Sequence, residues 1–304
     1  MELNSFVFPS SKSSYTYDDL SNNLVFIPRA PIVDGKSIFG APTHYLSEES
    51  KHIPCLYVSC ENPSSKLLLY FHGNAEDIGQ TCGLLETLNK YLNVHTLAME
   101  YPSYGIYPGK PNEGRIIEDC TNVFDYLTLK ANWKSTNIIL AGRSIGSGPS
   151  IYLASHRDPC ALLLISAYTS VKAAAKNIAG SVLQVLVKDR FKNKKLMDNV
   201  TCPVFLLHGM KDTIVPYSHA QELLTACKGP CLLSMPEHMD HCKMDYITDL
   251  CKPFENFLKK CQISTAPEKG VTEPDFPDDM FKLPTNYPSV AGPGIMKKLI
   301  LKLM

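Results

Sequence analysis

Short apolar runs alternate with helix-compatible stretches along most of this 304-residue sequence. The run KLLLYF at 66–71 is bounded by serines and a glycine, which is typical of a strand buried in a parallel sheet. Strands that alternate with helices need a parallel sheet with crossover helices on both faces. We therefore predict an α/β fold. Further strands are expected at 94–99, 137–141, 161–165, 204–207 and 231–235, and helices at 78–91, 112–131 and 246–260.

Three segments depart from this alternation. Residues 24–59 place short apolar runs between turn residues, which predicts antiparallel strands at the start of the sheet. The insert at 168–200 has the apolar spacing of an amphipathic helix that could cap a cleft, or of an ordinary lengthened crossover helix. Prolines, acids and small residues collect after Gln262 and predict a tail that is extended or disordered in isolation. We thus expect one domain over 1–262 and a tail over 263–304.

Composition excludes several classes of function. The sequence has 30 Lys and Arg against 30 Asp and Glu, so its net charge is zero and lacks the positive excess typical of nucleic-acid-binding proteins. Its 11 cysteines are scattered without CxxC pairs, which favours reduced thiols over a zinc site or a disulfide framework. No signal-peptide pattern and no apolar run of about 20 residues is present, so we expect a cytoplasmic protein.

The pentapeptide Gly142-Arg143-Ser144-Ile145-Gly146 directly follows an apolar strand and precedes a helix-compatible stretch. This is the strand-turn-helix setting of a nucleophile elbow, so Ser144 is the predicted nucleophile. Glycines are expected on both sides of the serine because side chains there would collide with the neighbouring strand and helix.

A serine hydroxyl needs a histidine to take its proton, and the histidine needs an acid to orient it. In this arrangement the acid follows the next-to-last core strand, where Asp212 stands. The histidine follows the last strand, where His238 and His241 compete; we favour His241 because it opens the final helix. Other histidines are expected at the surface rather than as ligands, including His52 and His219.

Acyl transfer also needs two backbone N–H groups that bind the oxyanion of the tetrahedral intermediate. One is expected from Ile145, immediately after the nucleophile, and the second from Asn74 in the HGNA turn after KLLLYF. No GxxxxGK[ST] phosphate cradle occurs, so we expect neither a nucleotide nor any other cofactor, and no metal.

Five segments of the sequence resemble those of one protein family: YFHGNAEDIGQ, EYPSYGIYPGKPNE, LAGRSIGSGPSIYLAS, ISAYTS and CPVFLLHGMKDTIVPYSHAQEL. From about Val25 to Lys260 the sequence resembles the alpha/beta hydrolase domain-containing protein 17 group and its Bem46-like relatives. The resemblance implies an α/β-hydrolase fold and a serine hydrolase, in a group best known as thioesterases that remove palmitate from membrane-attached proteins. Ser144, Asp212 and His241 then take the roles of nucleophile, acid and base.

The sequence departs from that group in one respect. Its depalmitoylating members carry an acylated N-terminal cysteine cluster, whereas this sequence has no cysteine before Cys55. The expected substrates are acyl esters or thioesters, lipid-modified proteins among them. The basic amphipathic stretch at 295–304 is a candidate for peripheral membrane contact. Two alternatives stay open, a serine peptidase-like hydrolase and a non-catalytic binding protein of the same fold.

Overall fold

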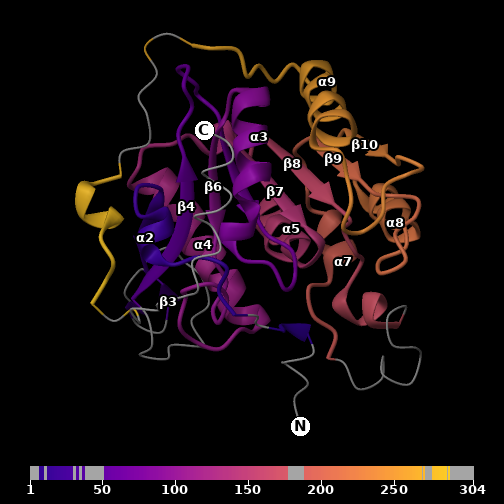
Figure 1. Ribbon diagram of the computed structural model, residues 1–304. Coiled ribbons are helices and arrows are strands. Elements are labelled where there is room, and N and C mark those ends of the chain that lie inside the picture. The colour runs from indigo at the N-terminus through magenta and orange to yellow at the C-terminus, as the bar shows by residue number, and fades with distance from the viewer. Residues whose placement is uncertain are drawn as a thin grey trace.

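The computed structural model describes residues 7–9, 12–29, 32–33, 36–37, 51–176, 188–268, 270, 276–285 and 287. Within these residues a sheet of eight strands runs through the molecule in the order β1-β4-β6-β5-β7-β8-β9-β10 (Figure 1). Its strands are β1 (Leu24–Pro28), β4 (His52–Val58), β5 (Leu67–Phe71), β6 (His95–Met99), β7 (Ile138–Arg143), β8 (Ala161–Ile165), β9 (Val204–Leu207) and β10 (Cys231–Ser234). Two short strands, β2 (Ile32–Val33) and β3 (Lys36–Ser37), pair with each other apart from it.

The sheet is mostly parallel. Strand β4 pairs antiparallel with β1 and with β6, and every other pairing in the sheet is parallel. Every residue of β5, β6, β8 and β9 is buried, which explains why β5, β8 and β9 are continuous apolar runs in the sequence. The predicted α/β fold, including the antiparallel start of the sheet, is confirmed.

Helices cover the sheet on both sides. Helix α3 packs with the segment that leads into α9, whereas α4 packs with α5 against the opposite face (Figure 1). The helices are α2 (Tyr17–Leu20), α3 (Cys82–Leu92), α4 (Glu113–Leu129), α5 (Ser147–His156), α7 (Asn193–Met197), α8 (Ser218–Ala226) and α9 (Lys252–Lys260). Among the described residues, no helix is both long and apolar enough to cross a membrane.

Two predicted helices begin differently from expectation. The helix expected at 78–91 starts with the 3-10 turn η1 (Ile78–Thr81), which the Asp77 side chain caps. The helix expected at 246–260 starts with a π-helical turn, η4 (Tyr246–Cys251). Pro253 lies at the start of α9 and has no N–H to donate into the preceding turn, so the hydrogen-bond pattern changes there.

The insert at 168–200 is only partly described. Residues 171–176 are helical, and Val171, Ala174 and Ala175 are buried on that helix. The chain is described again from 188, shortly before α7. Residues 177–187 lie outside the described part, so the predicted length of the helix stays a prediction.

The tail packs on the sheet edge where it is described. The Phe276 ring lies 5.1 Å from that of Tyr57, and the Tyr287 ring lies 5.2 Å from that of Phe26. The tail also forms the short 3-10 turn η5 (Asp278–Phe281). The aromatic side chains of this part bury apolar area against β1 and β4. The extended or disordered state expected of the isolated tail stays a prediction. The stretch at 295–304 lies outside the described residues.

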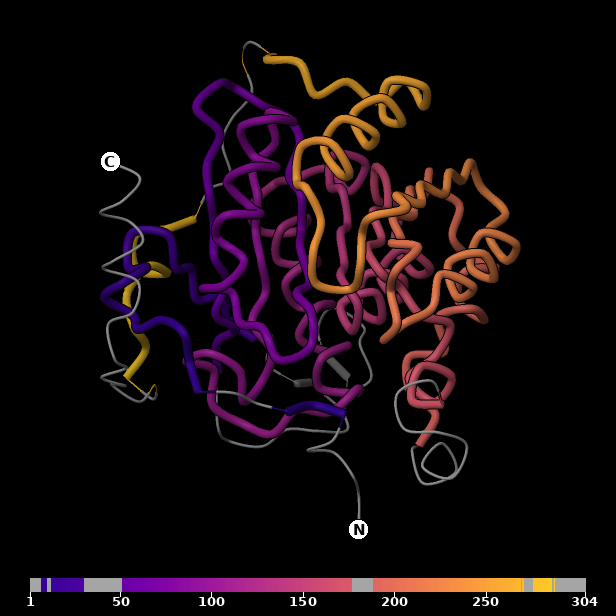
Figure 2. Tube along the Cα trace, turned by 45° about the vertical axis from the view of Figure 1, so that its right-hand side comes forward, coloured from indigo at the N-terminus to yellow at the C-terminus, as the bar shows by residue number. Residues whose placement is uncertain are grey.

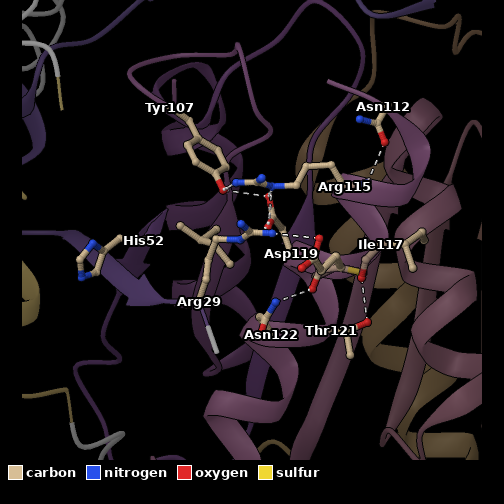
Figure 3. A network of polar contacts seen from close by, with 12 residues as sticks. Arg29, His52, Tyr107, Asn112, Arg115, Ile117, Asp119, Thr121 and Asn122 are labelled. Carbon is tan, nitrogen blue, oxygen red and sulfur yellow. Dashed lines mark hydrogen bonds and ion pairs between the residues drawn. The ribbon is translucent and has the colours of Figure 1, made fainter. Parts of the chain in front are cut away.

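A buried network of charges fastens the edge strand β1 to α4 (Figure 3). The Asp119 carboxylate contacts Arg29 Nε at 3.0 Å and Arg115 Nε at 3.1 Å, and it accepts a hydrogen bond of 2.9 Å from the Tyr107 hydroxyl. Arg29 also pairs with Glu118 at 2.9 Å. Two arginines thus balance two carboxylates, and all four side chains are at most 6% exposed. Such a network stabilises the fold only while every charge keeps its partner.

We expect Asp119→Ala to lower the free energy of unfolding by about 3–5 kcal/mol, because it leaves two buried guanidinium groups without this partner. Urea unfolding of the two proteins measures the difference. Glu255→Ala is the matched control: it removes the exposed pair with Lys259 on α9 and should cost less than about 0.5 kcal/mol. Equal losses in the two variants would contradict the anchoring role of Asp119.

Candidate active site

Ser144 occupies a strained turn between β7 and α5. Its φ is +49°, in the left-handed region that a non-glycine residue seldom adopts. Strand β7 ends immediately before it, and the short turn η3 (Ser144–Gly146) leads directly into α5. This geometry is that of a nucleophile elbow, in which backbone strain presents a side chain at the end of a strand.

The flanking glycines are needed for space. A Cβ on Gly142 would overlap the carbonyl oxygen of Gly146 and lie 2.5 Å from the Ser150 hydroxyl. A Cβ on Gly146 would overlap the carbonyl oxygen of Phe71 at the end of β5. The predicted collisions with the neighbouring helix and strand are therefore confirmed.

Asp212 lies in the loop after β9, and hydrogen bonds hold its side chain on both sides. Oδ1 accepts from the backbone N–H groups of Ile214 at 3.0 Å and Val215 at 2.8 Å, and Oδ2 lies 2.7 Å from Nδ1 of His241. Burial alone would raise the pKa of this carboxyl, but hydrogen bonds from His208 and His241 hold the pKa well below its ordinary value. Asp212 is therefore a carboxylate at neutral pH.

His241 comes from the loop between β10 and the final helix, and its side chain is 14% exposed. Because Nδ1 donates to Asp212, the other ring nitrogen, Nε2, is left to accept a proton. The competing His238 is 68% exposed and contacts Asp249 at 3.1 Å instead. The structure thus places His241, and not His238, against Asp212.

Ser144 and His241 line the same cavity, which has a volume of about 310 Å³. No hydrogen bond joins Ser144 Oγ to His241 Nε2 in the described part of the chain, and such bonds often close only around a substrate. The rest of the wall is mainly apolar; it includes Val7, Ile145, Tyr168, Val171, Ala174, Ala175, Ile214 and Val215. The arrangement can attack a carbonyl carbon whose apolar substituent occupies the cavity.

Asn74 and Ile145, whose backbone amides are the predicted oxyanion donors, also line this cavity. The Asn74 side chain is engaged elsewhere, since it donates to the Val7 carbonyl at 2.8 Å and accepts from the Tyr104 hydroxyl at 2.8 Å. The N–H of Gly73 is also taken, by the Glu76 carboxylate at 3.0 Å. Among the described hydrogen bonds, none uses the backbone N–H of Asn74. The N–H of Ile145 lies in the first turn of η3, where leading amides have no partner within the helix.

The buried His72 holds the Asn74 loop from behind. Its Nδ1 lies 2.9 Å from the Gly73 carbonyl oxygen, and its Nε2 lies 2.9 Å from Glu100, which also accepts from the Tyr15 hydroxyl. Burial lowers the pKa of His72, but its bond to Glu100 raises the pKa above the ordinary value. Because both ring nitrogens lie against oxygen acceptors, the surroundings of His72 favour the charged form of its imidazole.

Several histidines differ from the sequence prediction. His219 is only 6% exposed, so its expected place at the surface is wrong; its Nδ1 lies 2.9 Å from the hydroxyl of the buried Thr169. His208 is fully buried and contacts Asp212 at 3.3 Å. His52 is partly exposed. His208 and His219 can be buried because each has a polar partner inside the fold.

Sequence reasoning missed three residues at the cavity, namely Val7, Glu76 and Arg143. Val7 lies far from the other wall residues in the chain, and no local pattern marks it. Glu76 and Arg143 do lie inside quoted motifs, but only folding shows that they form an ion pair. All eleven cysteines fall within the described residues and are free thiols. The described part of the chain holds no cluster of three metal-ligating side chains.

Comparisons with known proteins agree with this architecture. The alpha/beta hydrolase domain-containing protein 17B of Homo sapiens is 29% identical over 184 residues, covering 60% of this chain and 63% of that protein. Protein 17C of Mus musculus is 31% identical over 173 residues, 57% of this chain and 53% of that protein. The chain thus spans less than two thirds of the length of these relatives. No family model matches it.

Solved structures show the same fold. The esterase Pf2001 of Pyrococcus furiosus superposes with a TM-score of 0.62 at 16% identity, covering 83% of this chain and 98% of that one. At such low identity the match concerns the fold alone. The chain is therefore an α/β-hydrolase-fold protein whose sequence resembles the alpha/beta hydrolase domain-containing protein 17 group.

Proposed function

We propose that this protein is a serine hydrolase that cleaves acyl esters or thioesters through an acyl-enzyme. One observation carries the proposal: the strained Ser144 borders the same apolar cavity as His241, which is held by the buried Asp212 carboxylate. A general base and an orienting acid beside an exposed serine hydroxyl are the requirements for nucleophilic catalysis.

The mechanism follows from these positions. Ser144 Oγ attacks the acyl carbonyl carbon while His241 Nε2 takes its proton, and Asp212 stabilises the imidazolium. The amides of Asn74 and Ile145 donate to the oxyanion. His241 then protonates the leaving alcohol or thiol, which leaves the acyl group bonded to Ser144. Water, deprotonated by His241, releases the acid and restores the serine.

A long-chain acyl thioester is the proposed substrate within this class. Apolar side chains make up most of the cavity wall, which favours an aliphatic acyl group over a polar one. The sequence resemblance to a group of depalmitoylating thioesterases supports the same choice. Removal of palmitate from a membrane-attached protein, and membrane contact through 295–304, remain proposals.

We expect a fluorophosphonate probe to label the protein at Ser144. Ser144→Ala should abolish this labelling and lower kcat/KM on acyl thioesters by about 10⁴-fold. The control is Ser155→Ala, which removes a hydroxyl at the far end of α5 and should retain wild-type labelling. An intact protein that never labels would favour a non-catalytic binding protein. Cleavage of peptides in preference to acyl esters would favour the peptidase alternative.

The low pKa of Asp212 makes it a pH-dependent contributor to stability. A carboxyl whose pKa is lower in the folded state stabilises the fold above its unfolded pKa of about 4, and this contribution is lost as the pH falls below that value. We expect the free energy of unfolding to decline less steeply between pH 5 and pH 2 in Asp212→Asn than in the wild type. Denaturant unfolding across this range measures both slopes, with the exposed Asp198→Asn as the control; equal slopes for Asp212→Asn and wild type would refute the expectation.

The cavity wall should select the acyl chain. Ala174→Leu adds three carbons at the wall, so we expect kcat/KM for a palmitoyl thioester to fall about 10- to 100-fold relative to that for a butyryl thioester. Ala173→Leu is the matched control, because Ala173 lies on the same turn but does not line the cavity. If kcat/KM falls equally for the palmitoyl and butyryl thioesters, the acyl chain does not contact Ala174.

A further inference from the structure

One ion pair connects three segments around the cavity. Glu76 lies in the loop after β5, and Arg143 ends β7 directly before Ser144; their side chains are 22% and 16% exposed. The Glu76 Oε2 accepts from the backbone N–H of Gly73 at 3.0 Å. The Arg143 Nη2 donates to the backbone carbonyl of His241 at 2.9 Å. The pair thus joins the loop that contains Asn74, the turn that contains Ser144 and the loop that contains His241.

These contacts act on the backbone of the reacting groups. Gly73 directly precedes Asn74, so the bond to Glu76 restrains the backbone next to the proposed oxyanion donor. His241 is held at two points, by Asp212 at its ring and by Arg143 at its carbonyl. Nothing in the chemistry of acyl transfer consumes Glu76 or Arg143, so their contribution lies in geometry and charge.

We propose that Glu76 and Arg143 form a positioning pair that holds the Asn74 loop and the His241 loop against Ser144, with charges that balance each other beside the base. The proposal rests on the proposed function and deepens it. A displacement of about 1 Å in a reacting group can cost about 10²-fold in rate, which makes this pair a control on kcat.

Charged and titratable groups surround His241 on every side. Asp212 contacts its ring, and the buried His208 lies behind Asp212. The remaining groups are Arg143, which contacts the His241 carbonyl, its partner Glu76, Tyr70 and Tyr246 near Arg143, and Asp240, Cys242 and Lys243 on the His241 loop itself. Because substitutions within the pair leave all the other groups in place, a change in the protonation of His241 can be attributed to the pair.

The two halves of the pair should move the acidic limb of the pH profile of kcat/KM in opposite directions. Arg143→Met leaves the negative Glu76 unbalanced, which favours the imidazolium and moves the limb to higher pH by about half a unit. Glu76→Gln leaves the positive Arg143 unbalanced and moves the limb to lower pH by a similar amount. In both variants we expect kcat to fall about 10- to 100-fold with KM within about twofold.

The double variant separates charge from geometry. Glu76→Gln with Arg143→Met removes both charges, so the acidic limb of the pH profile of kcat/KM should return to its wild-type position. The kcat should stay low because the ion pair no longer holds the two loops in place. The matched control is Arg157→Met, which removes the ion pair with Asp125 at 2.9 Å between α5 and α4, away from the cavity. It should leave kcat and the pH limb unchanged. Shifts in the same direction, or a kcat in Arg143→Met equal to that in Arg157→Met, would overturn the proposal.

An NMR titration of the His241 imidazole, assigned with His241→Asn, tests the pair without turnover. The opposite shifts should appear there as well, with thermal unfolding confirming that each variant is folded. If the variants show these shifts but the wild-type protein is neither labelled by the probe nor able to hydrolyse acyl esters, the proposed function alone is refuted. A hydrolytic wild type without opposite shifts would refute the positioning pair alone.

Discussion

The close approach of Gly146 to the Phe71 carbonyl is the contact on which the site depends. It is possible only because Gly146 has no side chain, and it brings the turn after β7 against the end of β5. Phe71 pairs with Gly142 in the parallel register of these two strands, so both chains leave the sheet at the same level. The strained Ser144 and the Asn74 loop consequently border one cavity. Any residue larger than glycine at 146 would separate them.

Polar contacts then fix loops that the sheet alone does not position. The buried His72 contacts Glu100 with one ring nitrogen and the Gly73 carbonyl with the other, so the loop after β5 is held from inside the fold. The Glu76–Arg143 pair holds the same loop from the cavity side. The indigo tube nearest the N-terminus lies at the lower edge of the molecule (Figure 2). Among the described N-terminal residues, Val7 lines the cavity. The cavity beside Ser144 is thus built from segments that lie between Val7 and Cys242 in the sequence.

Much of the fold could be predicted because its signals are local. Continuous apolar runs mark β5, β8 and β9 within a residue of their ends, and glycines mark the turn around Ser144. The prediction was wrong where burial depends on partners distant in sequence. His219 was expected at the surface, but Thr169 gives it a buried partner. The composition of the tail likewise does not reveal that Phe276 packs against Tyr57 of β4.

The sequence by itself determined the alternation of strands and helices and identified Ser144, Asp212 and His241 as candidate site residues. It could do so because strand patterns and turn motifs depend on residues that are neighbours in the chain. Only the tertiary structure decided that Asp212 contacts His241 rather than His238, that Glu76 pairs with Arg143, and that Val7 reaches the cavity. Each of these contacts joins residues whose separation along the chain says nothing of their distance in space. Packing of the whole sheet is what brings them together.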